Sequence, residues 1–541
     1  MIVWKKELID LYRGNDYDRC VRLCFENLYK KLDDAPCWYI LGMSLRKLSR
    51  SKEAIVALKM ALSVDEGLIA PLMPLAQALL AEDKIDEAKY WTEKYLLHDK
   101  NDVNVRYVFA ECLRKGGKLC EAIESLRESI QMTELGSPIG VRLCQSFFLT
   151  VEAIERENRQ KKNKSTFSVS HIDERGFCHA DDLNFEIQGY LEKLVVNAPC
   201  MSDAHMFLGA CYSSGRKFEL AGKHYKEAYR LDSRHDRAYT ARLCDSYFDL
   251  LNKTSVDSIA NKLPNVHCED DNFHIDQPVI FISCDYNYFF TFAIALINSI
   301  RHNSVGVNLH IHLMCLSLED KEISRIKKYI NKIDNLQVNF SYEFIPSFLS
   351  KQVCQGYYAS VRLFRLFQFM LRYNSSIMNL DVDGLVLKHL DLVFQYVKGH
   401  DIGVRIRPGR FDPWNQVDAA GFVISPTEVG IEYMKLVAKY VGIFALEEKS
   451  SWMLDQMSLF STMEFFRRHH RIDIKLLEDN MLGNQATPYS VIWKTAGGEK
   501  FNQAKQVHES WSDDQQVDNY TRLFHKYTNL YDSPSVNREF N

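Results

Sequence analysis

The 541-residue sequence has no apolar run of about 20 residues, so no segment is long enough to span a bilayer as a helix. Its 14 cysteines include no CxxC pair, and its first residues lack the pattern of a secretory signal. The net charge of −4 gives no indication of nucleic-acid binding. These absences predict a cytoplasmic protein with no transmembrane segment and no nucleic-acid partner, and the length predicts two or more domains.

The first half contains a repeat. Ala54, Ala88 and Ala122 follow one another at intervals of 34 residues, and Trp4 and Trp38 have the same separation. A small residue at a fixed place in every second helix lets two antiparallel helices approach closely. The period resembles that of tetratricopeptide (TPR) repeats and predicts an α-solenoid of TPR-like helix pairs.

The period is interrupted after about residue 133 and returns later. Residues 159–182 are polar and irregular, which predicts an insertion. The clearest unit is 205–232, and its matches to the consensus are Leu208, Gly209, Tyr212, Ala221, Tyr225 and Ala228. Residues 236–253 predict a closing helix. We therefore predict a helical repeat domain over 1–253, a linker over 254–276 and a second domain over 277–541.

The second half alternates short apolar runs with helical patterns. Such alternation predicts a parallel sheet covered by helices on both faces. The expected strands are 279–282, 309–316, 338–345 and 375–380, and the expected helices are 288–302, 319–331 and 359–374.

Two carboxylates, Asp381 and Asp383, follow the last of these strands, and Asp285 and Asn287 follow the first. Ligands of open α/β sheets bind beyond the carboxyl ends of the strands. Side chains two residues apart on a strand point the same way, so these acids repel unless they share a cation. The pattern predicts a divalent cation, Mn²⁺ or Mg²⁺, with phosphate oxygens completing its ligands. The alternative is a turn in which the carboxylates cap a helix.

Five motifs in order give residues 277–505 a resemblance to glycosyltransferase family 8, the glycogenin-like and galactosyltransferase-like enzymes with a GT-A (Rossmann-like) fold. They are SCDYNYFFTFAIALINSI, YYASVRLFRLF, IMNLDVDGLVLKHLDLVF, DAAGFVIS and LDQMSLF. The resemblance implies that the metal is held by Asp381 and Asp383. It also implies nucleotide-sugar contacts from Asp285, Asn287, Tyr288 and Arg362, and places Asp455 and Gln456 beside the reacting centre.

The sequence departs from the family pattern at two places. Ala419 stands where the family usually has Asn, so either Asp418 substitutes for it or the donor differs. The C-terminal His-x-x-Gly-x-x-Lys motif is represented by Lys494, Gly497 and Lys500. Three alternatives follow for the missing metal-binding His: the metal loses a protein ligand, His508 supplies it, or Lys494 neutralises phosphate. We favour a weaker metal site with Lys494 on the phosphate.

Other polar residues have two interpretations each. His310 and His312 on one strand are either packed in the core or a ligand pair. Trp414 either stacks on a sugar or packs in the core. The basic run 467–470 is either a solvated surface or a contact with phosphate or lipid headgroups, which leaves peripheral membrane association open.

The sequence therefore predicts a glycosyltransferase that uses a nucleotide-diphosphate sugar, with a UDP-hexose as the first candidate. Family membership implies retention at the anomeric carbon. In this prediction Lys494 and Lys500 stabilise the departing diphosphate, and Asp455 and Gln456 orient the acceptor or stabilise an oxocarbenium-like centre. The solenoid recruits a protein or glycan acceptor. The alternative is a TPR scaffold or adaptor whose transferase domain is degenerate.

Overall fold

The computed structural model describes the chain except residues 1–2, 165–179, 269–276, 316–319, 346–349, 408, 470–471, 484–488, 495–523, 525, 529 and 531–541. It divides into two compact units, Met1–Cys211 and Tyr212–Asn541. In the described part of the chain, no helix is both long and apolar enough to cross a membrane.

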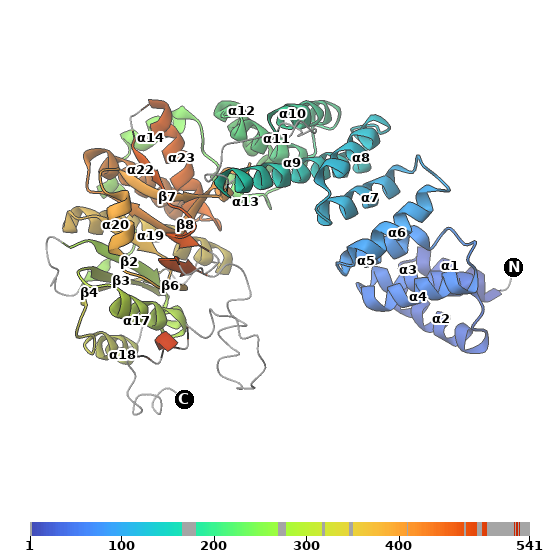
Figure 1. The fold of residues 1–541 in the computed structure, drawn as a ribbon, viewed down its shortest axis with the longest axis horizontal. Helices are drawn as coiled ribbons and strands as arrows, with labels where there is room; N and C mark the ends of the chain where they lie inside the picture. Colours follow the sequence, from blue (N-terminus) through green and yellow to red (C-terminus); the bar gives the residue numbers. More distant parts are fainter. Residues whose placement is uncertain are drawn as a thin grey trace. The chain divides into compact units, whose positions relative to one another are not determined.

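The first unit is built from helices arranged in antiparallel pairs (Figure 1). This confirms the prediction of a TPR-like helical solenoid. Its helices are α1 (Val3–Arg13), α2 (Tyr17–Lys30), α3 (Ala35–Lys47), α4 (Ser51–Val64), α5 (Leu72–Ala81), α6 (Ile85–Leu96), α7 (Val103–Lys115), α8 (Leu119–Gln131), α9 (Pro138–Lys164), α10 (Ala180–Asn197) and α11 (Ser202–Ser214), the last of which crosses the division.

Small residues determine how closely these helices pack. Ala54, Ala88 and Ala122 are completely buried on α4, α6 and α8. A Cβ atom added to Gly42 of α3 would lie 2.5 Å from Cγ of Leu58 on α4. Helices this close leave no room for larger side chains, which explains why a small residue recurs at this position in successive repeats.

The irregular insertion expected over 159–182 is shorter than predicted. Residues 159–164 continue α9 and residues 180–182 begin α10. Polar composition is therefore an incomplete signal, because a polar run can also continue a helix. Residues 165–179 lie outside the described residues.

The division between the units lies before the linker predicted over 254–276. The helices of residues 212–263 belong to the second unit, where Phe248 stacks on Phe465 with ring centroids 4.2 Å apart. Tyr225 contacts Trp414, which is buried in the core. These helices are α12 (Phe218–Leu231), α13 (Asp236–Thr240), α14 (Asp245–Lys253) and α15 (Val256–Ala260), so the predicted closing helix over 236–253 is interrupted.

The centre of the second unit is an eight-stranded sheet in the order β1-β4-β3-β2-β5-β8-β7-β9, with a three-stranded sheet, β10-β11-β6, beside it. The strands are β1 (Val266–Cys268), β2 (Val279–Cys284), β3 (Asn308–Cys315), β4 (Gln337–Phe344), β5 (Ile377–Leu380), β6 (Gly384–Val386), β7 (Ile402–Ile406), β8 (Val417–Ile424), β9 (Ile474–Leu476), β10 (Leu482–Gly483) and β11 (Ile492–Lys494).

Neighbouring strands of the large sheet are parallel from β4 through β3 and β2 to β5, as predicted. The strands added outside this predicted set make the sheet mixed, because β8 runs antiparallel to β5 and to β7, and β1 runs antiparallel to β4.

Helices cover both faces of this sheet (Figure 1). On one face Ile280 and Ile282 belong to the same core cluster as Leu296. On the other face Phe281 contacts Phe369 of α19. The helices are α16 (Tyr286–Tyr288), a π-helical turn (Phe289–Ala293), α17 (Ile294–Asn303), α18 (Asp320–Ile330), α19 (Lys351–Tyr373), α20 (Asp391–Val397), α21 (Pro413–Gln416), α22 (Glu428–Leu446) and α23 (Leu454–His469).

The strand order fixes the position of a candidate site. The chain builds β2, β3 and β4 outward in one direction and then returns to add β5 on the other side of β2. In doubly wound sheets, ligands bind at the carboxyl ends of the strands where the order reverses. Asp285 follows β2 and Asp381 follows β5, so these two residues flank the reversal.

Candidate functional site

Asp285 begins a helix. Its Oδ1 accepts the backbone N–H of Tyr288 at 2.7 Å, which makes it the N-cap of α16. Asn287 is exposed and Tyr288 is half-buried. Burial, followed by the Asp285 carboxylate, raises the pKa of Tyr358 on α19.

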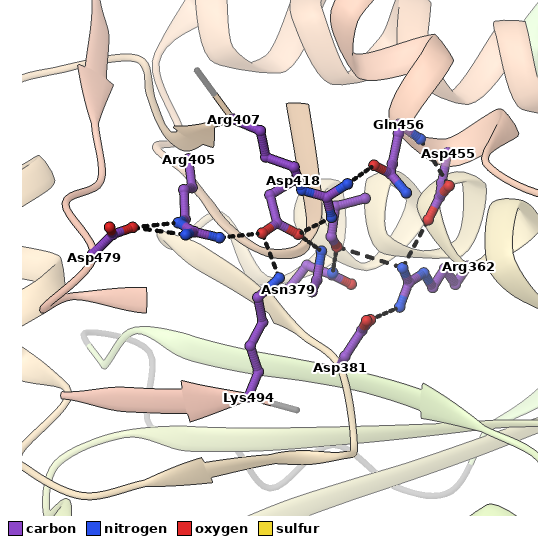
Figure 2. A network of polar contacts seen from close by, with 12 residues as sticks. Arg362, Asn379, Asp381, Arg405, Arg407, Asp418, Asp455, Gln456, Asp479 and Lys494 are labelled. Carbon is purple, nitrogen blue, oxygen red and sulfur yellow. Dashed lines mark hydrogen bonds and ion pairs between the residues drawn. The ribbon is translucent and has the colours of Figure 1, made fainter. Parts of the chain in front are cut away.

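Arg362 of α19 joins two carboxylates of the site (Figure 2). Its Nη1 donates to Oδ1 of Asp381, and its Nη2 donates to Oδ2 of Asp455 at 3.0 Å. Burial acts to lower the pKa of Arg362, but the two carboxylates outweigh it and hold the pKa above its usual value. The guanidinium is therefore a fixed positive charge between two acids.

Asp455 lies in the first turn of α23 and is buried. Burial raises its pKa, and Arg362 opposes this effect. The adjacent Gln456 accepts a hydrogen bond from Nη1 of Arg407 through Oε1 at 3.0 Å. The structure thus brings together Arg362, Asp381, Asp455 and Gln456, four of the residues predicted from the sequence.

A second cluster surrounds Asp418 of β8, which is completely buried. Its carboxylate accepts from Nη1 of Arg405 at 2.9 Å, from Nη2 of Arg407 at 3.1 Å and from Nζ of Lys494. Burial alone would raise the pKa of Asp418, but these three cations hold it well below its usual value. Arg405 also contacts the exposed Asp479 at 2.7 Å. Figure 2 shows that the two clusters are joined through Arg407 and Gln456.

Lys494 reaches this cluster from the smaller sheet. It is the last residue of β11 and pairs with Gly384 of β6, directly after Asp383. Its side chain is only 5% exposed and points toward Asp418 (Figure 2). Burial lowers the pKa of Lys494, while Asp418 and Asp381 act to raise it.

The two acids predicted to bind a metal have other surroundings in the structure. Asp381 contacts Arg362, and Asp383 is buried beside β6. Among the described residues, no group of three or more His, Cys, Asp or Glu side chains could hold a metal ion. Gly497, Lys500 and His508 lie outside the described residues, so the roles predicted for them stay predictions.

The two histidines of β3 are packed in the core. His310 Nε2 and His312 Nδ1 each lie 2.8 Å from the hydroxyl of Ser341, and His312 Nε2 lies 3.4 Å from Glu343. His310 also lies 2.6 Å from the hydroxyl of Tyr373. These contacts favour the structural interpretation over a pair of metal ligands.

The basic run 467–470 is largely paired with carboxylates. Arg467 contacts Glu464, and both Arg468 and His469 contact Asp245. These pairs favour a solvated surface over a headgroup site. Residue 470 lies outside the described part of the chain.

Sequence reasoning missed Arg405 and Arg407. The available signal was their spacing, because two arginines at alternate positions near the end of a strand project from the same face. Residues 403–407 read GVRIR. Without the register of β7 against β8, nothing connected these arginines to Asp418.

No family model matches the chain. No curated protein matches it either. Among solved structures, one similar chain is YrrB, which is described as a TPR protein with an unusual peptide-binding site. It is 15% identical, the match covers 40% of this chain and 96% of that one, and the TM-score is 0.29. Part of a TPR repeat-containing protein from Cytophaga hutchinsonii is 11% identical (48% and 92% covered, TM-score 0.34). A thermophilic TPR protein from Thermus thermophilus is 14% identical (38% and 99% covered, TM-score 0.27).

Proposed function

We propose that residues 212–541 transfer a hexosyl group from a nucleotide-diphosphate sugar to a protein or glycan acceptor, and that a UDP-sugar is the donor. The observation that carries this proposal is the continuous charged network beyond the carboxyl end of β5, the strand next to β2. It lies where doubly wound sheets bind nucleotides, and it includes residues that the family 8 resemblance places around the donor.

The two clusters of the network have opposite charge balances. Around Asp418, three cations face one buried carboxylate, a surplus of positive charge that suits a diphosphate leaving group. Around Arg362, two carboxylates face one cation, which suits the positive charge that develops on the sugar. This polarity supports cleavage of a sugar–phosphate bond.

Asp455 and Gln456 are the proposed residues beside the reacting centre. Burial favours the protonated form of Asp455, whereas Arg362 favours the carboxylate. Such a group is able to exchange a proton with an acceptor hydroxyl or to stabilise positive charge on the sugar. Retention at the anomeric carbon rests on the resemblance alone.

The divalent cation that the resemblance implies is poorly matched by the described residues. The Asp381 carboxylate is engaged by a guanidinium, and an ammonium stands at the position of the expected histidine. A protonated amine has no lone pair to give to a metal. We therefore derive no step through a metal ion.

The test is donor binding and hydrolysis by the whole chain. A true donor among UDP- and GDP-hexoses should raise the melting temperature, since it binds the native state alone. Asp455→Asn should abolish hydrolysis while leaving that shift in place. Glu432→Gln is the matched control, because Glu432 is an exposed carboxylate of α22 that contacts Lys435. Full hydrolysis by Asp455→Asn would contradict the proposal.

We propose that the repeats of the first unit recruit the acceptor. The second candidate function is a scaffold with a degenerate transferase domain, and the observation that favours it is Lys494 in place of the expected histidine. A chain that binds no sugar nucleotide but retains a partner through residues 1–211 would support the scaffold.

A further inference from the structure

One departure from the family 8 pattern contacts the residue beside the other. Lys494 stands at the position of the expected histidine, and Asp418 directly precedes Ala419, which replaces the expected asparagine. Nζ of Lys494 donates to Oδ2 of Asp418. A carboxylate and an ammonium 76 positions apart form one buried ion pair.

The backbone of Lys494 lies beside the segment that follows the acidic pair. Lys494 lies opposite Gly384, the residue that follows Asp383, and Asp381 is near enough to raise the pKa of the ammonium. An ammonium has three N–H donors and no acceptor. Within the described part of the chain, one donor is used on Asp418, and the other two are available to the oxygens of a ligand.

The charges around Asp418 exceed what this carboxylate neutralises. Lys494, Arg405 and Arg407 bring three positive charges to one carboxylate. The only other acid that contacts them among the described residues is Asp479, whose side chain is 86% exposed and is well screened by solvent. A buried surplus of positive charge is stabilised by an anion that enters the site.

We propose that this site binds a nucleotide diphosphate without a divalent metal ion, with the Lys494 ammonium supplying the positive charge that the metal supplies elsewhere in the family. The inference rests on the proposed function. Asp418 acts as a positioning residue, because it holds the ammonium beyond the carboxyl end of β5. Arg407, which is half-buried, adds a second charge on the same side.

The alternative is that Lys494 and Asp418 form a purely structural ion pair. The two interpretations predict different effects of Lys494→Gln on UDP affinity. After this substitution Asp418 still accepts from Arg405 and Arg407, so the buried carboxylate keeps cationic partners and the fold should persist. A structural pair would then leave UDP affinity unchanged. A phosphate-binding ammonium would not, because charge-assisted contacts to phosphate are among the strongest hydrogen bonds.

The experiment is calorimetric titration of UDP into the full chain, once with EDTA and once with Mn²⁺. The parent should bind equally well in both. Lys494→Gln should bind roughly ten- to a hundred-fold more weakly in EDTA. Lys494→His should also bind weakly in EDTA but recover when Mn²⁺ is added, because a neutral imidazole is a metal ligand. Lys435→Gln, at a lysine of α22 whose side chain is 37% exposed, is the matched control and should match the parent.

Electron paramagnetic resonance of Mn²⁺ gives a readout independent of UDP. The signal of free Mn²⁺ should persist with the parent and fall with Lys494→His. UDP binding by the parent only in Mn²⁺, or parent-like affinity of Lys494→Gln in EDTA, would overturn the inference and leave the proposed function standing. Absence of UDP binding in both conditions would overturn both.

Discussion

Residues 212–263 should be inseparable from the rest of the second unit, which follows them in the chain. Phe218, Tyr225 and Phe248 are buried, and they contact Phe460, Trp414 and Phe465 respectively. An aromatic side chain buries about 150–250 Å², so deleting these three exposes a partner surface on the order of 500 Å². At roughly 25 cal/mol per Å² this costs about 12 kcal/mol. A typical domain has only about 5–15 kcal/mol of net stability.

Two fragments test this reasoning. A fragment that begins at residue 202, where α11 begins, should be soluble and unfold cooperatively. A fragment that begins at residue 277 should aggregate or lack a cooperative transition. Circular dichroism melts and size-exclusion chromatography measure both properties. A soluble 277–541 fragment with the melting temperature of the longer one would refute the contribution assigned to these aromatic contacts.

A point substitution tests the same interface in the intact chain. Phe248→Ala removes a ring stacked on Phe465 and should cost about 3–5 kcal/mol. The melting temperature of the second unit should fall by on the order of 10 °C. Leu250→Ala is the matched control, because Leu250 lies on the same helix with 53% of its surface exposed. Equal effects of the two substitutions would contradict a buried interface.

Three further predictions concern stability. Asp418→Ala leaves three cations without their shared carboxylate and should lower the free energy of unfolding by about 3–5 kcal/mol in urea titrations; a loss below about 1 kcal/mol would contradict the buried cluster. Burial lowers the pKa of His310 well below its usual value, so the unfolded chain takes up the proton first and stability falls as the pH drops below about 6.5. His310→Gln should therefore make the urea midpoint less dependent on pH between about 7.5 and 5.5. An unchanged dependence would exclude His310 as the source of the pH effect. Gly42→Ala forces a Cβ against Leu58 and should cost about 1–3 kcal/mol, whereas Gly67→Ala, with only ordinary contact, should be nearly neutral in the same denaturation assay.

The repeat was predictable because its signal is local. Ala54 and Ala88 report the close approach of helices that are adjacent in the chain, so the spacing of small residues is sufficient to identify it. The end of the repeat domain was not predictable in this way. Phe248 keeps a helical pattern like that of the earlier repeats, but its partner Phe465 lies far along the chain, beyond most of the sheet. Periodicity describes the helix and does not identify the surface on which it packs.

The charged network was likewise predictable only in part from the sequence. The acids were found because β5 and β2 are apolar strands with polar residues at their carboxyl ends. Arg405 was missed because its contact depends on an irregularity between Val404 and Arg405, where the register of β7 against β8 shifts and brings Arg405 opposite Asp418. A bulge of this kind leaves no pattern in the sequence of either strand.

Asp381 and Asp383 illustrate why charge alone does not identify a metal site. Two acids after a buried strand need a positive partner. Either a divalent ion or a nearby basic side chain can serve as that partner. Arg362 lies 19 positions before Asp381, on the helix that leads into β5, and its guanidinium contacts that carboxylate. A chain that supplies its own cations at such a place loses less binding energy when metal is scarce. The response of UDP binding to EDTA is therefore the measurement that separates metal-dependent binding of UDP from binding in which lysine and arginine neutralise the diphosphate.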